Sequence, residues 1–430
     1  MTIGIIGLGY VGLTLAIAAA DCGIKTYGVE VSTKIKNCLK ENKAHFFEPG
    51  LDALIEKHNN NMFYCVDNFP ETEKFDAFIV TVGTPLKPGE SVPNFDYIKS
   101  ALLAVKKVYT GNELFILRST VSVGTTRNIV VPYLAQLCNV VEEDILVSFC
   151  PERTIEGKAI DELKNLPQII SGNNEKSLEI AQKIFRKITP YVIEAASLEE
   201  AELAKLYCNT YRDITFALGN VFCMAAQKFG VNGMNAIKTA NQGYQRSNIC
   251  LPGFVAGPCL EKDAYILTNN MEECGSKDFI LGARKFNESL EDMVVDWVEK
   301  KIGEACLDKV VTLSGMAFKG VPETSDLRGS ASVYIARKLK KKGYILRLHD
   351  FVADLDEMRA LELGECFSDF NEAVAGTGIL LILNNHKKYM SIRLDKRYMD
   401  KTVPILDSWD VCQGLKNDDA NICNLGDMNI

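Results

Sequence analysis

Residues 2–12, Thr-Ile-Gly-Ile-Ile-Gly-Leu-Gly-Tyr-Val-Gly, have the pattern of a short apolar strand that runs into a glycine-rich turn. The spacing is Gly-x-Gly-x-x-Gly, at Gly7, Gly9 and Gly12. In a dinucleotide-binding turn the first glycine permits the tight bend, and the second lets backbone N–H groups approach a pyrophosphate. The third lets the following helix pack closely on the strand. The stretch therefore predicts a phosphate site at a helix N-terminus, where unpaired N–H groups and the helix dipole favour anions.

The residues after the turn complete a βαβ unit. A helix of small residues is expected over Leu13–Ala20 and is closed by Gly23, and a second strand over Ile24–Val29 ends in an acid, Glu30. A carboxylate at that strand end hydrogen-bonds the adenosine ribose and repels a 2′-phosphate, which favours NAD over NADP. Glycines also mark ordinary turns, so a plain turn is the alternative. The order of strand, turn, helix and acid favours the dinucleotide.

Length and composition are those of a soluble enzyme. The 430 residues predict two to three domains, and the net charge of −8 argues against a general affinity for nucleic acid or an anionic membrane surface. No apolar run approaches the roughly 18 residues of a membrane span. Because Met1 leads directly into the first strand, we expect no signal peptide and a cytoplasmic location.

Cysteine and histidine usage argues against disulfides and metals. Fourteen cysteines are scattered along the chain without a Cys-x-x-Cys pair, which indicates reduced thiols. The four histidines show no ligand spacing, so no metal site is expected. They are His45, His58, His349 and His386.

The first half of the chain alternates strands with helical stretches, which predicts a parallel sheet. The clearest further strands are Asp76–Val82, Leu114–Arg118 and Ile145–Phe149. Ligands of such sheets bind beyond the carboxyl ends of the strands. The loops after these strands are Gly83-Thr84-Pro85, Ser119-Thr120 and Cys150-Pro151-Glu152. Each could be a connecting turn, but three loops at one edge suit a cofactor and substrate crevice.

A long helix is expected in the middle of the chain. Ser197 and Glu200 form a capping box, helical periodicity continues to Lys228, and Gly230 ends it. About thirty residues give a helix of about 45 Å, because each residue rises 1.5 Å. This length is unusual for one domain, and apolar residues surround much of the helix. We therefore expect it to bridge two domains and to offer a dimerisation face.

A second series of strands comes after this middle region. The expected strands are Lys309–Ser314, Tyr344–Asp350, Ile379–Asn384 and Val403–Asp407, and Ser330–Lys342 is an expected helix ended by Gly343. This is a second α/β domain without a complete glycine fingerprint. The tail after Gln413, with its Asn, Asp and Gly residues, is expected to be irregular.

Cys259 differs from the other cysteines in its surroundings. Glycine and proline hold it in a loop over Gly253–Asp263, with Lys262 and Asp263 three and four residues on. A nearby ammonium lowers the pKa of a thiol and raises its thiolate fraction. Most cysteines are inert small hydrophobic residues, and that is the alternative here.

Lys205 and Asn209 are four residues apart on the long helix, so they share one face. A solvated helix lysine is the ordinary interpretation of Lys205 taken alone. The wider set of motifs favours a functional one.

That set extends through nearly the whole chain. It comprises Gly7–Gly12, Glu48-Pro-Gly-Leu51, Thr84-Pro85, Arg118–Thr126, Cys150–Ala159, Glu202–Lys205 with Asn209, Tyr244-Gln-Arg246, Gly257–Asp263, and Gly315–Lys319 with Asp326 and Arg328. The set resembles the nucleotide-sugar 6-dehydrogenases, the family of UDP-glucose, UDP-N-acetylglucosamine and UDP-N-acetylmannosamine dehydrogenases.

The resemblance implies the domain plan. The expected fold class is α/β, with two Rossmann-like doubly wound domains joined by a long central helix. An NAD-binding domain is expected at 1–196 and a UDP-sugar-binding α/β domain at 301–430. The central region at 197–300 would hold the bridging helix, the dimer interface and the catalytic cysteine. The assembly implied is a homodimer or a higher oligomer.

The resemblance also implies the chemistry. The C6 alcohol of the sugar is oxidised to an aldehyde, which Cys259 captures as a thiohemiacetal. A second oxidation gives a thioester, and water releases the carboxylate. Lys205 and Asn209 would stabilise the alkoxide at C6. Proton transfers would fall to Asp263 with Thr120 and a water, and thioester hydrolysis to Glu156.

Binding residues carry over from the family motifs. Those expected to contact NAD are Gly7, Gly9, Tyr10, Val11, Gly12, Glu30, Thr84, Pro85, Thr120, Glu152 and Lys262. Those expected to contact the UDP-sugar are Glu152, Arg153, Lys205, Asn209, Arg246, Phe254, Gly257, Lys319 and Arg328. Arg246 matches an arginine that reaches the substrate of the neighbouring subunit.

Some positions bear on the choice of sugar. Arg153 stands where UDP-glucose enzymes carry an aromatic residue and, with Leu166–Ile170 and Tyr244–Arg246, favours a UDP-N-acetylhexosamine (ManNAc or GlcNAc) for polysaccharide synthesis. Lys262 is common in UDP-glucose enzymes, so UDP-glucose 6-dehydrogenase is an alternative. Trp409 replaces a usual arginine and puts that contact in doubt. A non-catalytic nucleotide-sugar-binding homologue is the alternative of another class.

Overall fold

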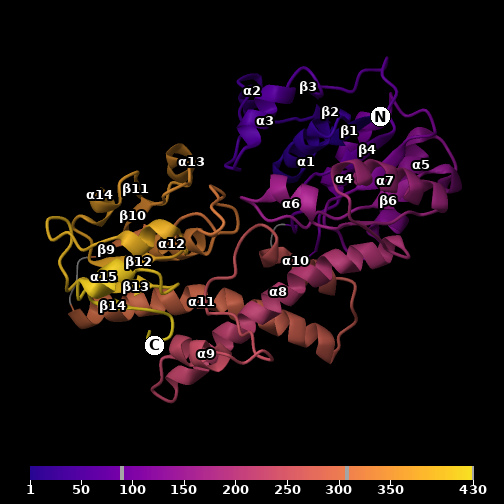
Figure 1. The fold of residues 1–430 in the computed structure, drawn as a ribbon. Helices are drawn as coiled ribbons and strands as arrows, with labels where there is room; N and C mark the ends of the chain where they lie inside the picture. The colour runs from indigo at the N-terminus through magenta and orange to yellow at the C-terminus, as the bar shows by residue number, and fades with distance from the viewer. Residues whose placement is uncertain (88–91, 306–308, 429–430) are drawn as a thin grey trace. The chain divides into compact units, whose positions relative to one another are not determined.

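The computed structural model describes residues 1–87, 92–305 and 309–428. The chain forms two compact units, one of residues 1–208 with 265–272 and one of residues 209–264 with 273–430. The boundary between them crosses two helices, α8 (Leu198–Gln227) and α10 (Leu260–Thr268). Figure 1 traces the chain through both units, from indigo at the N-terminus to yellow at the C-terminus.

The first unit is built on a parallel sheet of six strands in the order β3-β2-β1-β4-β5-β6. The strands are β1 (Thr2–Ile6), β2 (Lys25–Val29), β3 (Phe63–Val66), β4 (Ala77–Val80), β5 (Leu114–Leu117) and β6 (Val147–Phe149). Each expected strand is confirmed, within two residues at either end. The strand order reverses between β1 and β4, and ligands of such sheets bind at that point.

Helices cover both faces of this sheet. They are α1 (Tyr10–Asp21), α2 (Thr33–Lys40), α3 (Leu51–His58), α4 (Asp96–Leu102), α5 (Val131–Cys138), α6 (Ala159–Asn165) and α7 (Glu175–Ile188). Successive strand residues alternate between two cores: Ile79 packs with α1, α3, α6 and α7, whereas Phe78 packs with α4 and α5. Two short strands, β7 (Gln168–Ile170) and β8 (Val192–Glu194), pair beside the sheet. The doubly wound arrangement is confirmed.

The long helix α8 begins and ends close to the expected residues. The Ser197 hydroxyl accepts a hydrogen bond from the Glu200 N–H at 3.1 Å, and the Glu200 carboxylate accepts from the Ala196 N–H at 3.0 Å. The second bond goes one residue earlier than a capping box predicts. Gly230, with φ of +67°, comes shortly after the end of the helix.

The middle region also contains a second long helix, which the sequence analysis missed. α11 (Gly275–Ala305) has 31 residues, one more than α8. A short helix, α9 (Gly233–Asn241), lies between α8 and α10 in the sequence. Among the described helices, none is both long and apolar enough to cross a membrane.

The second unit repeats the strand order of the first. Its parallel sheet has the order β11-β10-β9-β12-β13-β14. The strands are β9 (Val310–Ser314), β10 (Ile345–His349), β11 (Glu365–Phe367), β12 (Ile379–Ile382), β13 (Ile405–Asp407) and β14 (Ile422–Cys423). The helices among them are α12 (Ala331–Lys341), α13 (Leu355–Ala360), α14 (Phe370–Val374) and α15 (Gln413–Asn417). α11 and α12 pack side by side on one face of this sheet (Figure 1).

The prediction of an irregular tail after Gln413 is wrong. The tail forms α15 and then β14, which completes the sheet by pairing Ile422 with Ile405. Leu415 and Leu425 are fully buried in two different cores of the unit. Pairing and burial therefore outweigh the weak local propensity of the Asn, Asp and Gly residues.

Candidate active site

The glycine-rich turn of the first unit has the geometry that its spacing predicts. Gly7 has φ of +89°, and a Cβ at Gly12 would overlap the Gly7 carbonyl oxygen. The space beside Gly9 is open, and Gly9 caps the N-terminus of α1. Backbone N–H groups at this helix end are therefore accessible to an anion such as a pyrophosphate.

Glu30 lies beside this turn. Its carboxylate accepts hydrogen bonds from the Leu8 N–H at 2.7 Å and the Ser32 N–H at 2.8 Å. Each carboxylate oxygen has a further lone pair. The side chain is thus fixed at the end of β2 with acceptor capacity left for ribose hydroxyls.

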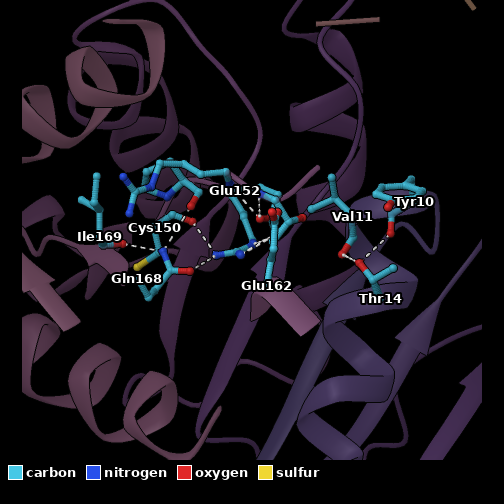
Figure 2. Close-up of polar contacts among 12 residues, drawn as sticks. Tyr10, Val11, Thr14, Cys150, Glu152, Glu162, Gln168 and Ile169 are labelled. Atoms are coloured by element: carbon cyan, nitrogen blue, oxygen red, sulfur yellow. Dashed lines mark hydrogen bonds and ion pairs between the residues drawn. The ribbon is translucent and has the colours of Figure 1, made fainter. Parts of the chain in front are cut away.

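Tyr10 joins the turn to the loop after β6. Its hydroxyl donates to Glu48, whose carboxylate also accepts from the N–H groups of Gly157 and Ala159, each at 2.7 Å. Burial, the bond to Glu48 and the charge of Glu156 all raise the pKa of Tyr10 far above its ordinary value. The hydroxyl therefore stays neutral, and Glu156 lies in the same neighbourhood. The first turn of α1 is further held by the Thr14 hydroxyl, which donates to the Tyr10 carbonyl at 2.8 Å (Figure 2).

The loops after β4, β5 and β6 lie at one edge of the sheet, because all three strands are parallel. The Thr84 hydroxyl donates to the Thr120 carbonyl at a short distance, which joins the first loop to the second. The Ser119 hydroxyl donates to the Val82 carbonyl at 2.6 Å. The convergence expected for the loops after β4 and β5 is confirmed.

Glu152 in the third loop is held from several sides (Figure 2). Arg118 donates two hydrogen bonds to one carboxylate oxygen, and the N–H groups of Arg153 and Thr154 donate to the other at 2.7 Å each. Arg118 also donates to the side chain of Gln168 at 2.9 Å. Burial disfavours the charged form of Glu152, but the guanidinium and the backbone donors outweigh it and hold the pKa below its ordinary value. Glu152 therefore fixes the loop as an ionised group.

Lys205 is a buried cation on α8. Its residue is only 8% exposed, and its positive charge is among those that lower the pKa of Glu152. The structure gives its ammonium no hydrogen bond or ion pair within the described residues. An ammonium with open donor capacity, on a side chain that is largely buried, is suited to a developing negative charge.

The second unit brings four of the predicted residues together. Asn209 on α8 donates to one oxygen of Asp263 at 2.6 Å, and Lys262 donates to the other at 3.0 Å. Burial disfavours the charged form of Lys262, but the negative charges of Asp263 and Cys259 outweigh it and raise its pKa. Lys262 thus remains an ammonium close to Cys259.

Cys259 stands at the N-terminus of α10. Its carbonyl accepts the first hydrogen bond of the helix from the Asp263 N–H at 3.0 Å, and its side chain is exposed. A helix N-terminus and a neighbouring ammonium both favour a thiolate. An exposed thiolate is a nucleophile, so this position is suited to covalent chemistry.

The loop before Cys259 passes close to other parts of the second unit. Gly257 has φ of +100°, and a Cβ there would lie 2.7 Å from the Phe318 ring. A Cβ at Gly253 would lie 2.5 Å from the Trp409 ring, whose indole N–H donates to the Leu383 carbonyl at 3.0 Å. Trp409 therefore contacts the cysteine loop itself.

The remaining predicted contacts lie on loops of the second unit. Lys319 lies 5.3 Å from the centroid of the Phe318 ring. Arg328 is largely exposed and donates to Asp326 at 2.6 Å. Arg246 is exposed, with its guanidinium 5.0 Å from the centroid of the Tyr244 ring. Phe254 is buried in the core beside the sheet. No cluster of three or more His, Cys, Asp or Glu suited to a metal occurs in the described part of the chain.

A group of buried polar residues behind the cysteine loop was not predicted from the sequence. They are Asp213, Asn220, Arg284 and Asn287. Two lie on α8 and two on α11, and only the folded chain brings them together. The one available signal was their polar character within apolar helical stretches.

Comparison with known proteins accords with this geometry. Residues 1–189, 199–289 and 312–414 match the NAD binding, central and UDP binding domains of the UDP-glucose/GDP-mannose dehydrogenase family. These three domains define an NAD-dependent nucleotide-sugar dehydrogenase. The chain belongs to the UDP-glucose/GDP-mannose dehydrogenase family, so the expectations of family and of NAD are confirmed.

Two similar proteins and one similar solved structure are named as dehydrogenases of UDP-N-acetyl-D-mannosamine. A UDP-N-acetyl-D-mannosamine dehydrogenase of Campylobacter jejuni is 33% identical over 409 residues, which cover 91% of this chain and 97% of that protein. One of Methanococcus maripaludis is 31% identical over 418 residues, covering 96% and 90%. The solved structure of a UDP-D-ManNAc dehydrogenase from Pyrococcus horikoshii has a TM-score of 0.88 at 26% identity, and the match covers all of both chains.

Proposed function

We propose that this protein oxidises the C6 hydroxyl of a UDP-N-acetylhexosamine to a carboxylate, with N-acetylmannosamine as the favoured sugar. The observation that carries this is the group of Asn209, Lys262 and Asp263 around the exposed Cys259. The relatives named above act, by their names, on UDP-N-acetyl-D-mannosamine. A uronic acid product suits the synthesis of polysaccharide precursors.

Two residues on α8 are proposed to stabilise the alkoxide that develops at C6. Lys205 has a largely buried side chain whose ammonium has open donor capacity, and Asn209 is four residues further along the same helix face. Fixed donors aimed at developing charge lower a barrier without reorganising during the reaction. NAD, when bound, accepts the hydride in each of the two oxidations.

Cys259 is proposed to capture the aldehyde. Its thiolate would add to C6 to form a thiohemiacetal, and the second oxidation would convert this to a thioester. Water would then release the carboxylate and return the thiol. Covalent capture divides a difficult oxidation into easier steps and retains the reactive aldehyde.

Proton transfer is proposed for Asp263, with Thr120 and a water. Asp263 is almost fully buried and accepts from both Asn209 and Lys262, so its carboxylate is held in one place. Glu156 is proposed to assist hydrolysis of the thioester. A positioned carboxylate can take a proton from the attacking water.

The binding residues are proposed as two sets. NAD would lie on the turn Gly7–Gly12 with Glu30, Thr84, Pro85, Thr120, Glu152 and Lys262 around it. The UDP-sugar would contact Glu152, Arg153, Lys205, Asn209, Arg246, Phe254, Gly257, Lys319 and Arg328. The proposed division is a cofactor domain at 1–196, a central region at 197–300 and a UDP-sugar domain at 301–430.

The protein is further proposed to be a homodimer that acts in the cytoplasm. One side of α8 exposes large apolar residues at helical spacing: Tyr207, Tyr211, Leu218, Val221 and Phe222 are 39–70% exposed. A second copy could cover this surface, and a two-fold interface buries the same patch on both subunits. Arg246 would then serve the partner's substrate. No disulfide joins any of the thirteen cysteines among the described residues, as is usual for thiols in a reducing compartment.

The test is an assay of NADH formation with three substrates: UDP-N-acetylmannosamine, UDP-N-acetylglucosamine and UDP-glucose. We expect two NADH for each sugar consumed, a uronic acid product, and the highest kcat/KM with UDP-N-acetylmannosamine. Preference for UDP-glucose would replace the proposed sugar. One NADH for each sugar, or none with any of the three, would overturn the proposed reaction.

A further inference from the structure

A buried polar cluster lies behind the loop that carries Cys259. Its members are Asp213 and Asn220 on α8 and Arg284 and Asn287 on α11. None is more than 2% exposed. All four belong to the second unit, as does the cysteine loop. None of them has a place in the chemistry described above.

Arg284 bonds to two backbone carbonyls of the cysteine loop, one on either side of Cys259. One terminal nitrogen donates to the Val255 carbonyl at 3.1 Å, and the other donates to the Leu260 carbonyl at 3.2 Å. Cys259 lies between these two residues in the sequence and directly precedes Leu260. The guanidinium therefore fixes both ends of a six-residue segment that includes the nucleophile.

Asp213 holds Arg284 in this position. Its carboxylate accepts from the guanidinium at 2.7 Å, and both side chains of the pair are 2% exposed. Asn287 donates to the same carboxylate oxygen of Asp213 at 2.9 Å. Because burial removes water as a competitor, this ion pair is held by its protein partners alone.

Asn220 holds the start of the loop. Its side-chain amide donates to the Gly253 carbonyl at 3.1 Å and accepts from the Gly253 N–H at 2.9 Å. It also donates to Asn287 at 2.9 Å. A continuous chain of hydrogen bonds thus runs from Gly253 through both asparagines and Asp213 to Arg284.

The use of an arginine here is informative. A buried ion pair between two helices adds little stability over well-packed apolar residues of the same volume. A planar guanidinium, however, presents several donors in a fixed arrangement and can hold three acceptors at once. Apart from its ion pairs with Asp213 and with Glu288, whose Oε1 lies 3.1 Å from Nε, the guanidinium donates to two backbone carbonyls of one loop, which is what placing that loop requires.

We propose that Arg284, seated by Asp213, is a positioning residue for the Cys259 thiol. The proposal rests on the function proposed above. Arg284 touches neither the thiol nor the substrate, and it acts through the carbonyls of Val255 and Leu260. When the hydrogen bonds from Arg284 to these two carbonyls are lost, the loop samples other conformations. The thiol then leaves its fixed place at the N-terminus of α10.

The test uses Arg284→Lys, which keeps the charge but offers a single ammonium in place of the guanidinium fork. The matched control is Trp297→Phe, a change at a residue of the same helix that is 1% exposed and packs in the core. Two readouts are compared with the unaltered protein. One is kcat and KM, and the other is the rate at which iodoacetamide alkylates each cysteine across pH, measured by peptide mass spectrometry.

Arg284→Lys is expected to lower kcat by about tenfold or more, since small misplacements of a reacting group have effects of that size. The pH midpoint for Cys259 alkylation should rise, and the Kd for NAD should stay within about twofold. The exposed Cys274 should react as before, and the buried Cys412 should stay protected. Trp297→Phe should leave the Cys259 profile unchanged.

A second variant covers the case in which Arg284→Lys fails to fold, which labelling of Cys412 would reveal. Asp213→Asn keeps the shape of the side chain and removes the buried one of the two carboxylates paired with Arg284, so the same selective change at Cys259 is expected. Unchanged kcat and an unchanged Cys259 profile in a folded variant would overturn the positioning role. Exposure of Cys412 in both variants would overturn it too, because the cluster would then serve folding alone.

Failure of the proposed function gives a different result. In that case the unaltered protein shows no faster alkylation of Cys259 than of Cys274, and Cys259→Ser retains the full two-step turnover. Failure of the positioning role alone leaves Cys259 reactive and essential, with Arg284→Lys indistinguishable from the control.

Discussion

The two sheets share a strand order and the turn that directly follows their first strands, but they differ in what comes after that turn. In both, a glycine with positive φ stands directly after that strand: Gly7 at +89° and Gly315 at +96°. In both, an acid after the second strand accepts from a backbone N–H of the turn. Glu30 accepts from Leu8 at 2.7 Å, and Asp350 accepts from Ala317 at 2.9 Å.

The two units differ in the segment between this shared glycine and the next helix. In the first unit α1 begins at Tyr10, so a helix N-terminus stands directly beside the turn. In the second unit α12 begins only at Ala331, and the residues between carry Lys319 and Arg328. Gly329 in this segment accepts from the Gly257 N–H at 2.8 Å. The same strand order thus offers a helix end for a dinucleotide in one unit and charged side chains beside the cysteine loop in the other.

The role of the N-terminus of α1 in binding NAD is tested by Gly12→Ala. The added Cβ would overlap the Gly7 carbonyl, so α1 must move away from β1. We expect the Kd for NAD to rise by ten- to about a hundredfold, as the 1–3 kcal/mol of overpacking implies. UDP binding to the second unit, measured by calorimetry, should change little. Gly282→Ala on α11, where the space is open, is the control. An unchanged Kd for NAD would show that close packing at Gly12 is unimportant.

The interiors of the two sheets differ at matching positions. His349 ends β10 where Val29 ends β2, and the Ser314 hydroxyl lies 2.8 Å from its Nδ1. Burial lowers the pKa of His349 to about 4, against the opposite pull of Asp350. Between pH 6.5 and 4 the unfolded state therefore takes up a proton that the folded state excludes, so stability falls as the pH falls.

The expected loss from this histidine is about 2 kcal/mol between about pH 7 and about pH 5. Urea unfolding at both pH values measures it, and the second unit should unfold first at the lower pH. His349→Gln should remove this part of the pH dependence. If that variant kept the full pH dependence of unfolding, the loss would have to come from other groups.

Contact between Trp409 and the cysteine loop is tested by Gly253→Ala. The new methyl group would lie 2.5 Å from the indole ring and displace the loop. We expect kcat to fall by about tenfold, because overpacking would raise the activation free energy by about 1.4 kcal/mol. Trp409→Ala in the same chain should restore part of the lost activity, because it removes the colliding ring. If Gly253→Ala and the double variant were equally active, the loss of activity would not come from a collision with Trp409.

The smallest effect is expected from a change at Arg246, an exposed residue of the second unit. Arg246→Ala should raise the KM for the UDP-sugar by about fivefold, as the loss of one charge-assisted contact implies. NAD binding should be unchanged, and sedimentation should still show the proposed dimer. An unaltered KM would show that Arg246 does not contact the substrate. It would not contradict the proposed dimer.

The predictable features were those that neighbouring residues impose on one another. The turn at Gly7 and Gly12 results from backbone sterics within a few residues, and the start of α8 results from Ser197 and Glu200. β14 was missed because its two residues are stable only through their pairing with β13. Local propensity gives no sign of such a strand.

The cluster behind Cys259 could not be predicted for a similar reason. Arg284 meets Asp213 across 71 positions of the sequence and the Val255 carbonyl across 29. Nothing in the spacing of polar residues along α8 or α11 specifies these partners. The candidate nucleophile Cys259 could be predicted from the sequence, because glycine, proline and Lys262 all lie within a few residues of it.

The covalent role of Cys259 is the central claim, and trapping the intermediate tests it most directly. The protein is mixed with the UDP-sugar and excess NAD, quenched in acid within milliseconds to seconds, digested, and analysed by mass spectrometry. The predicted result is a sugar acyl adduct on the peptide that contains Cys259, which decays as the uronic acid appears. Two NADH for each sugar with no adduct on Cys259, or an adduct on another cysteine, would contradict the account.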